Sequence, residues 1–368
     1  IENVLLIKTN LMNKKPIILG IESSCDETAA SIVTENEHGV PTILSSIVSS
    51  QVDVHKKFGG VVPELAARSH IEKIDSITKK AIDDSGIKMK EIDAVAATAG
   101  PGLIVCLSVG LSFGKAMASS LNKPFIAVNH LEGHALSPKL DSKLNYPYLL
   151  LLISGGHTQF LSVQGLGNYK RLGTTIDDAV GEAFDKTGKL LGIDFPGGPQ
   201  IEIYAKKGDP TKYILPKPIF HKGGCNLSFA GLKTAVLKIS KQIKTEQEKY
   251  NLAATFQKTI EEILYKKSEV AFKQFKEINN NNKKTFVIAG GVAANKEIRQ
   301  VLKNLCKKEN FEAVFPPINL CGDNAAMIAM VGMEKFKLNQ FNKLDHAAKP
   351  RWPLDEDAVF LKGAGVKL

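Results

Sequence analysis

The chain has 368 residues, enough to bury a substantial core and to form two domains or one large two-lobed unit. Its 43% hydrophobic content and 30 glycines fit a soluble α/β protein. Its five cysteines are odd in number and show no C-x-x-C spacing, so they suggest neither a zinc knuckle nor a disulfide framework. The net charge of +10 favours a polyanionic partner such as nucleic acid, although a lysine-rich solvated surface gives the same charge.

The N-terminal fifteen residues carry only a short apolar run at residues 4–7. This run is too short for a signal peptide and far too short to span a bilayer. Met12 is a candidate natural start, and no other run suggests a membrane span. We therefore expect residues 1–15 to be an extension. The cysteine count and spacing fit a reducing cytosol best, so we expect the protein to be cytoplasmic.

Residues 16–22 predict a buried strand, residues 23–28 a small polar turn, and residues 29–33 a second strand, so that the whole forms a hairpin opening a sheet. Hydroxyls and backbone amides in such a turn could cradle phosphate. Asp26 and Glu27 could hold a metal or orient water. A plain hairpin turn without a ligand remains the alternative.

The following segment predicts helices at residues 65–84 and 103–120 and strands at 92–97 and 125–128. The turn at residues 98–102 carries glycine on both sides of its proline, which suits a ligand loop or a sharp strand-to-helix bend. The strand ending at residue 128 leads directly to His130.

His130 and His134 stand four residues apart. On a helix both would lie on one face, one turn apart, where they could share a metal ion. A third ligand must come from elsewhere, and Asp323, which lies among small residues, is the best candidate. An isolated pair of this kind also fits two solvated surface histidines; the other motifs favour the metal.

The second half repeats the layout of the first, with strands at residues 148–153 and 159–163 around a small polar turn at residues 154–158. Two such hairpins predict duplicated ribonuclease H-like lobes with a cleft between them. Further along, residues 176–186 predict a helix and residues 194–199 a rigid turn, and lysines crowd from residue 206 to 249. His157, in the second hairpin turn, could be structural or catalytic.

The strand at residues 285–289 ends in Gly290-Gly291, and residues 296–306 predict a helix. A Gly-Gly step admits a flat ring against the backbone, and Asn295 could bond its edge or a ribose. A tight strand-to-helix turn would look the same. A last strand at residues 311–317 precedes the Asp323 loop, and residues 324–338 should be helical.

Together these strings closely resemble the family of tRNA N6-adenosine threonylcarbamoyltransferases, once described as O-sialoglycoprotein endopeptidases. The resemblance runs from about residue 16 to residue 354 and suggests the bacterial or organellar form. Its motifs fall at residues 20–28, 59–64, 98–102, 129–134, 153–159, 177–186, 195–198, 228–234, 290–295 and 321–329.

The resemblance implies the actin-like ATPase fold, an α/β fold of two ribonuclease H-like lobes with a nucleotide in the interlobe cleft. It implies one divalent metal per chain, Fe²⁺ or Zn²⁺, held by His130, His134 and Asp323. Lobe I would span residues 16–128, completed by residues 324–368, and lobe II residues 129–323. The implied substrate contacts are Leu152, Ile153, Ser154, Gly155, Gly156, Asp185, Gly198 and Asn295. A further family carboxylate contact would fall near Glu202.

The implied reaction moves a threonylcarbamoyl group from threonylcarbamoyl-AMP to N6 of the adenosine 3′ of the anticodon, in tRNAs that read codons beginning with A. Asp26 or Glu27 would accept the amine proton. The implied partners are tRNA, an inactive paralogue of the same fold as heterodimer partner, a small P-loop ATPase and a synthase that supplies the adenylate. No membrane is involved.

Three alternatives stay open. In metallopeptidases of the H-E-x-x-H type the glutamate follows the first histidine, whereas here Leu131 does and Glu132 is rotated by about 100 degrees on a helix. A sugar kinase or chaperone-like ATPase of the same fold would need phosphate turns but no two-histidine metal site. A non-enzymatic nucleotide-binding scaffold would not need the metal ligands.

Overall fold

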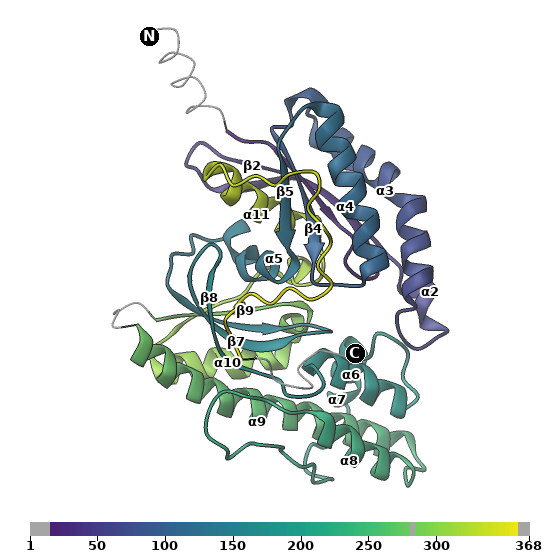
Figure 1. Ribbon diagram of the computed structural model, residues 1–368. Helices are drawn as coiled ribbons and strands as arrows, with labels where there is room; N and C mark the ends of the chain where they lie inside the picture. Colours follow the sequence, from purple (N-terminus) through teal and green to yellow (C-terminus); the bar gives the residue numbers. More distant parts are fainter. Residues whose placement is uncertain (1–14, 280–283, 360–368) are drawn as a thin grey trace, which may run out of the picture. The chain divides into compact units, whose positions relative to one another are not determined.

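The computed structural model describes residues 15–279 and 284–359 and divides into two compact units (Figure 1). The first unit comprises the described residues up to Ser50 together with Pro63–Lys143 and Asn324–Arg351. The second comprises Gln51–Val62, Leu144–Asp323 and the described residues from Trp352 onward. Apart from Lys15, the expected extension lies outside the described residues, and the lobe limits expected at residues 128 and 323 stay a prediction.

The first unit is built on a five-stranded sheet with the order β3-β2-β1-β4-β5. Its hairpin joins β1 (Ile18–Glu22) antiparallel to β2 (Glu27–Glu35), as the sequence predicts, and β3 (Pro41–Ser50) adds a third antiparallel strand. β4 (Ala94–Gly100) and β5 (Phe125–Asn129) follow in parallel on the other side of β1. The carboxyl ends of β1, β4 and β5 therefore meet at one edge of the sheet.

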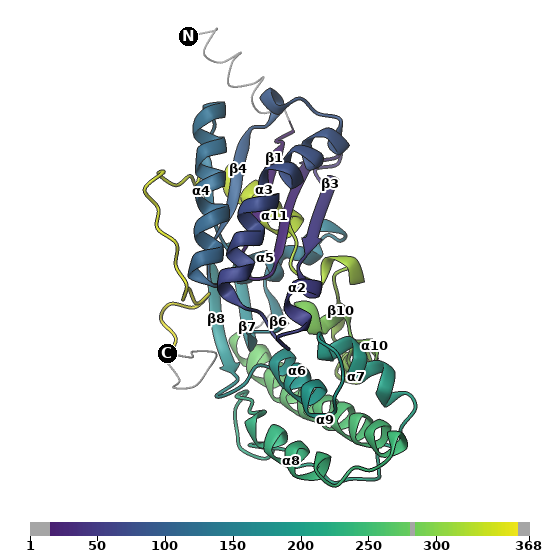
Figure 2. The same cartoon turned by 90° about the vertical axis from the view of Figure 1, so that its right-hand side faces the viewer.

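Helices cover both faces of this sheet (Figure 2), and the alternation of side chains along β1 shows which helix covers which face. Gly20 lies against α11 (Ala325–Lys337), where a Cβ atom would stand 2.3 Å from the Ala325 carbonyl oxygen. Ile21, on the opposite face, lies near Gly110 and Gly114 of α4 (Ile104–Leu121). α3 (Pro63–Ser85) packs beside α4. The shorter elements of this unit are η1 (Met89–Glu91), α5 (His130–Leu136) and η2 (Ser137–Leu140).

α4 is the one described helix that is long enough and apolar enough to cross a membrane by length and composition alone. Its residues Cys106, Leu107, Leu111 and Ala118 are buried, and the helix packs against β4 and α3. This is the arrangement of a core helix in an α/β protein.

The second unit repeats the topology of the first, with the sheet order β10-β9-β6-β7-β8. β6 (Tyr148–Ile153), β7 (Thr158–Gly165) and β8 (Asn168–Thr174) are antiparallel, while β9 (Thr285–Ala289) and β10 (Glu312–Val314) run parallel to β6. Each unit thus has a three-stranded meander extended by two parallel strands. The duplicated fold expected from the two hairpins is confirmed.

Several helices of the second unit differ from the expectation. α6 (Val180–Leu190) begins four residues later than predicted, because Asp177 accepts hydrogen bonds from Phe229 N (2.7 Å) and Ala230 N (3.2 Å) at the start of α8 (Ala230–Ser240). The turn expected at residues 194–199 is shorter, because α7 (Gly197–Ala205) begins within it. The remaining elements are α2 (Val52–Lys56), α9 (Glu246–Ile278), η3 (Gly291–Ala294), α10 (Lys296–Glu309) and η4 (Ile318–Leu320).

Candidate metal centre and glycine-lined turns

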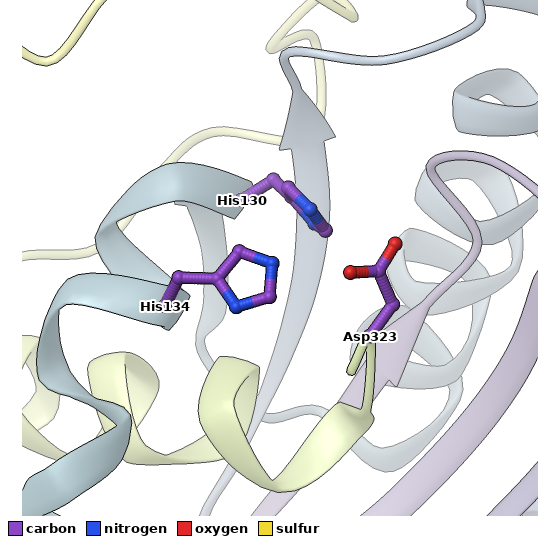
Figure 3. Close-up of side chains that lie close together, drawn as sticks. All are labelled: His130, His134 and Asp323. Carbon is purple, nitrogen blue, oxygen red and sulfur yellow. The ribbon is translucent and has the colours of Figure 1, made fainter. Parts of the chain in front are cut away.

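His130, His134 and Asp323 converge (Figure 3). One ligand atom from each lies within 4.8 Å of the others, and both imidazoles are buried. Donor atoms around a tetrahedral metal with bonds of about 2.1 Å stand about 3.4 Å apart, so small side-chain rotations suffice to close a site. The imidazole rings stand edge to face with centroids 4.8 Å apart. The residues present therefore fit a divalent metal.

Two asparagine caps fix the segments that carry these ligands. Asn129 Oδ1 accepts from Leu131 N (2.9 Å) and starts α5 at His130, and Asn324 Oδ1 accepts from Met327 N (3.0 Å) and starts α11. The division of the chain falls between Asp323 and Asn324, so Asp323 is one peptide bond from the first-unit segment that carries α11. α5 packs on α11, and Gly133 keeps the two helices close.

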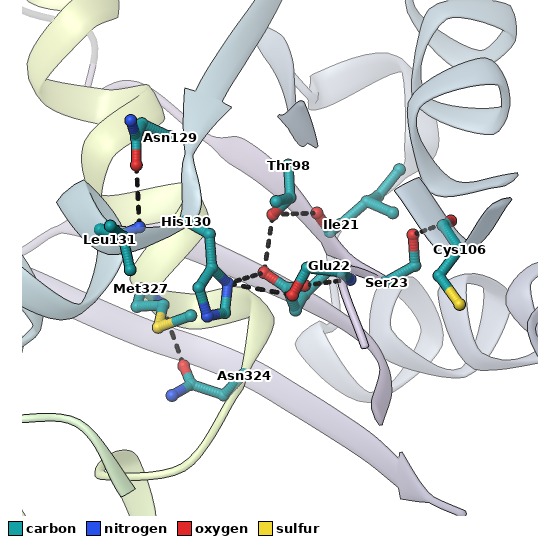
Figure 4. Close-up of polar contacts among 11 residues, drawn as sticks. Ile21, Glu22, Ser23, Thr98, Cys106, Asn129, His130, Leu131, Asn324 and Met327 are labelled. Atoms are coloured by element: carbon teal, nitrogen blue, oxygen red, sulfur yellow. Dashed lines mark hydrogen bonds and ion pairs between the residues drawn. The ribbon is translucent and has the colours of Figure 1, made fainter. Parts of the chain in front are cut away.

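Glu22 at the end of β1 orients His130 (Figure 4). Its Oε2 atom lies 3.0 Å from His130 Nδ1 and accepts from the Thr98 hydroxyl at 2.7 Å. Its Oε1 atom accepts from Ser24 N, and the Ser24 hydroxyl also lies 3.2 Å from His130 Nδ1. A carboxylate beside Nδ1 favours the tautomer with the proton there, which leaves Nε2 as the metal-binding atom. The sequence analysis missed this role because a glutamate at a strand end has no local signature.

Replacing Glu22 with glutamine is expected to lower the affinity for metal about 10- to 100-fold, because the neutral amide supports the His130 tautomer less strongly. Competition with a chromophoric chelator measures the change. Glu35→Gln is the matched control, since Glu35 lies at the far end of β2 and pairs with Lys337. If the Glu22 and Glu35 variants bind metal with equal affinity, Glu22 has no role in metal binding.

Glu132 is the α5 carboxylate that the peptidase alternative would have to use, although it lies one residue beyond the position of the H-E-x-x-H glutamate, which Leu131 occupies here. It is buried, and its carboxylate lies 3.1 Å from Lys335 Nζ on α11. An ion pair with Lys335 occupies this carboxylate, which a peptidase would need to activate water. The geometry thus supports the expectation that Glu132 does not act as the base that activates a metal-bound water.

Asp26 and Glu27 lie in and directly after the turn that carries Ser24, at the start of β2, and both are half-buried. His70 of α3 holds this turn: its Nε2 atom lies 3.0 Å from the Cys25 carbonyl oxygen and its Nδ1 atom 2.8 Å from the Thr28 hydroxyl. Because a carbonyl only accepts, Nε2 carries the proton. The turn is therefore rigid, and the catalytic role of Asp26 and Glu27 stays a prediction.

The second unit presents bare backbone at one edge of its sheet. β6 and β9 are parallel neighbours, so the turns after Ile153 and Ala289 lie side by side. Gly290 has a φ of +98°, and a Cβ atom there would stand 2.4 Å from the Ile153 carbonyl oxygen. At Gly155, Gly156 and Gly291, all exposed, a Cβ atom would meet nothing within 4 Å. Leu152 and Ile153 are fully buried, and as consecutive residues of β6 their side chains point into opposite faces of the sheet.

Ser154 and the start of α6 complete the β6–β7 turn. The Ser154 backbone N donates to His157 O (2.8 Å), and the Ser154 hydroxyl accepts from His157 N (3.1 Å). Gly181 N donates to Ser154 O (3.2 Å), and Gly181 leaves no room for a Cβ atom against Gly155. His157 thus contributes backbone contacts that shape the turn.

Asp185 and Gly198 lie at the junction of α6 and α7. The half-buried Asp185 carboxylate accepts from Gly197 N (2.7 Å) through Oδ1 and so holds the first residue of α7. On a helix over residues 176–186, spacings of three or four residues are expected to bring Asp178, Glu182, Asp185 and Lys186 within reach of one another. The ion pairs in fact join Lys186 to Asp178 (2.6 Å) and to Glu182 (2.9 Å).

Asn295 starts α10, where its Oδ1 atom accepts from Ile298 N at 3.0 Å. Glu202, the candidate for a further substrate contact, accepts from the backbone N of Lys296 (3.1 Å) and lies 3.7 Å from Lys206. The first turn of α10 therefore engages both side chains.

Comparison with known proteins gives the family. Residues 42–330 match the family described as TsaD, tRNA N6-adenosine threonylcarbamoyltransferase. A protein of that name from Pelagibacter ubique is 86% identical over 357 residues, which cover 97% of this chain and 100% of that protein. One from Rickettsia rickettsii is 53% identical and covers 92% of this chain and 98% of that protein.

Among solved structures, HypF from T. kodakarensis matches 90% of this chain with a TM-score of 0.59 at 13% identity. The matched part is 49% of that HypF chain, so this chain spans about half its length. A second, full-length HypF structure matches with a TM-score of 0.56. These neighbours support the actin-like fold with two related sheets. By the family match and the two relatives, the chain belongs to the tRNA N6-adenosine threonylcarbamoyltransferase family.

Proposed function

We propose that the protein transfers the threonylcarbamoyl group from threonylcarbamoyl-AMP to N6 of the adenosine 3′ of the anticodon, in tRNAs that read codons beginning with A. The observation that carries the proposal is the convergence of His130, His134 and Asp323 in a chain of this family. A kinase of the same fold would not need this cluster. A peptidase would need the carboxylate of Glu132, which pairs with Lys335.

The chemistry needs placement more than a strong base. The exocyclic amine is a weak nucleophile because its lone pair is delocalised into the ring, whereas AMP is a good leaving group. Backbone amides at Gly155 and Gly156 suit the phosphate, where negative charge develops as AMP departs. Asp26 or Glu27 accepts the proton that the amine loses. Asp185, Gly198 and Asn295 hold the adenylate.

Two histidines and one carboxylate form the donor set typical of Fe²⁺, and Zn²⁺ accepts the same ligands. We propose one such ion per chain, held by His130, His134 and Asp323. When bound, it supplies a Lewis acid that polarises a carbonyl or phosphate oxygen. Glu22 keeps His130 in the tautomer that binds it.

The tRNA surface that we propose lies on α8 and the loop after it, and consists of exposed lysines without a described ion pair: Lys233, Lys238, Lys241 and Lys244. Four other lysines of the basic region lie within 4 Å of a carboxylate, whereas Lys207 and Lys222 have no described ion pair. Lys212 and Lys249, for example, lie 3.7 Å from Asp209 and 3.6 Å from Glu246. Net positive charge is therefore concentrated along α8.

Binding of tRNA is expected to weaken steeply with salt, because each phosphate contact releases counterions. Replacing Lys233, Lys238 and Lys241 with glutamine should lower the slope of log K against log salt by about two to three. The same change at Lys212 and Lys249 is the control and should alter the slope by less than about one. If tRNA binding by the unaltered protein does not change with salt, these lysines are solvated surface residues that do not contact phosphate.

We further propose a cytoplasmic protein that works with an inactive paralogue as heterodimer partner, a small P-loop ATPase and the synthase that supplies the adenylate, without a membrane. Exposed apolar side chains on the first unit support a protein partner. Ile71 of α3 is 65% exposed, and Ile104 and Val105 of α4 are 48% and 44% exposed.

Mass spectrometry of tRNA nucleosides tests the proposal. The protein is incubated with tRNA, ¹³C-labelled threonine, bicarbonate, ATP and the presumed partners. The tRNA is then digested to nucleosides, whose masses are measured. We expect labelled threonylcarbamoyladenosine only when this chain is present. Unmodified tRNA in the complete mixture, with glycoprotein cleavage or sugar phosphorylation instead, would favour the peptidase or kinase alternative.

A further inference from the structure

Asn295 is held in one orientation by a chain of amides. Its Nδ2 atom donates to Gln257 Oε1 at 3.0 Å, and Gln257 Nε2 lies 3.2 Å from Asn295 Oδ1, so the two amides form a reciprocal pair. Gln257 Nε2 also donates to Glu261 Oε1 at 3.0 Å. Gln257 and Glu261 both come from α9, one turn apart, and are 3% and 7% exposed.

The direction of every bond in this chain is fixed at both ends. At one end the backbone N–H of Ile298 needs an acceptor, which places Oδ1 of Asn295 toward α10. At the other end the Glu261 carboxylate needs a donor, which places the NH₂ group of Gln257 toward it. Turning either amide over would set oxygen against oxygen or N–H against N–H at a buried position.

The carboxylate of Glu261 is itself held in place. Its second oxygen lies 3.5 Å from Lys258 Nζ, one turn back on the exposed side of α9. Burial, with a smaller contribution from Glu297, raises the pKa of this carboxyl above its usual value, and Gln257 and Lys258 offset only part of that shift. The group therefore has both a donor and a cation to keep it as an acceptor.

We propose that Gln257 and Glu261 are positioning residues that hold Asn295 as a hydrogen-bond donor to the adenylate. The Nδ2 group of Asn295 has a second hydrogen, and no described residue is recorded as taking it. Asn295 ends the short helix η3, which begins at the open backbone of Gly291, and the proposal assigns this hydrogen to a ligand bound there. The atom of the adenylate that meets Asn295 must then be an acceptor, such as a ribose oxygen or an unprotonated ring nitrogen.

This inference rests on the proposed function, and its test compares KM for the adenylate with kcat. Gln257→Met keeps the volume and removes the amide. We expect it to raise the KM for the adenylate, and the Kd for AMP measured by calorimetry, about tenfold with kcat within about threefold. Glu261→Leu should do the same, and Glu261→Gln, which keeps an oxygen acceptor, should recover most of the loss.

Gln247→Leu is the matched control, because Gln247 is an exposed glutamine of the same helix that donates to the Lys207 carbonyl. Its KM should equal that of the unaltered protein. If Asn295→Ala raises KM and Gln257→Met does not, the positioning role is overturned while the proposed function stands. If Gln257→Met lowers only the melting temperature, the network is structural and the inference is again overturned. If the unaltered protein does not transfer the threonylcarbamoyl group at all, the proposed function itself is contradicted.

Discussion

Replacing His130 and His134 together with alanine is expected to reduce threonylcarbamoyl transfer to background. Bound metal should fall from about one ion per chain to near zero, because a single carboxylate cannot retain the ion. The fold should persist, since Asn129 caps α5 and Gly133 packs against Met327 and Ile328 of α11. Transfer is measured with purified adenylate and tRNA, and metal by elemental analysis.

The matched control replaces two exposed histidines, His38 and His221, with alanine. This control should keep both the metal and the transfer rate. If the variant with both His130 and His134 replaced transfers at the full rate, the reaction does not depend on a metal held by these histidines. Loss of its far-UV circular dichroism would show that the imidazoles are needed for folding instead.

Replacing Gly290 with alanine is expected to destabilise the second unit by about 3 kcal/mol. The backbone there has a φ of +98°, which an L side chain rarely adopts, and the new Cβ atom would meet the Ile153 carbonyl oxygen at 2.4 Å. For a unit of this size the melting temperature should fall by about 10 °C. Differential scanning calorimetry measures the shift.

Gly291→Ala is the neighbouring control. It meets no atom within 4 Å and needs no positive φ, so the melting temperature should change little. Equal melting temperatures of the two variants would show that the turn after β9 yields easily. The account of a rigid backbone edge beside β6 would then fail.

Much of the fold could be predicted because its hairpins carry local signals. Apolar runs at β1 and β6, each followed by small polar residues, predict both meanders and therefore the duplication. β3 was missed because four of its ten residues are serines and its one buried position is Ser45, so its apolar residues form no continuous run. α9 was missed because its apolar positions are interleaved with lysines and glutamates over 33 residues, and what buries them is contact with α7 and α10.

The candidate site was also predictable only in part, because residues close together in the chain could be paired and most contacts between distant residues could not. His130 and His134 could be paired from their spacing, since four residues make one helical turn. The convergence of Asp323 with them depends on the packing of α5 against α11, which no local pattern encodes. The contacts of Glu22 with His130, and of Gln257 with Asn295, join residues far apart in the chain. Hydrogen bonds of this kind follow only from the assembled fold.

The metal dependence of transfer tests the central claim most directly. The protein is stripped with a chelator, reloaded with increasing Fe²⁺ or Zn²⁺, and assayed with purified adenylate and tRNA together with its partners. We predict that transfer disappears in the stripped protein and returns in proportion to bound metal, up to one ion per chain. Undiminished transfer by protein shown to hold no metal would contradict the account.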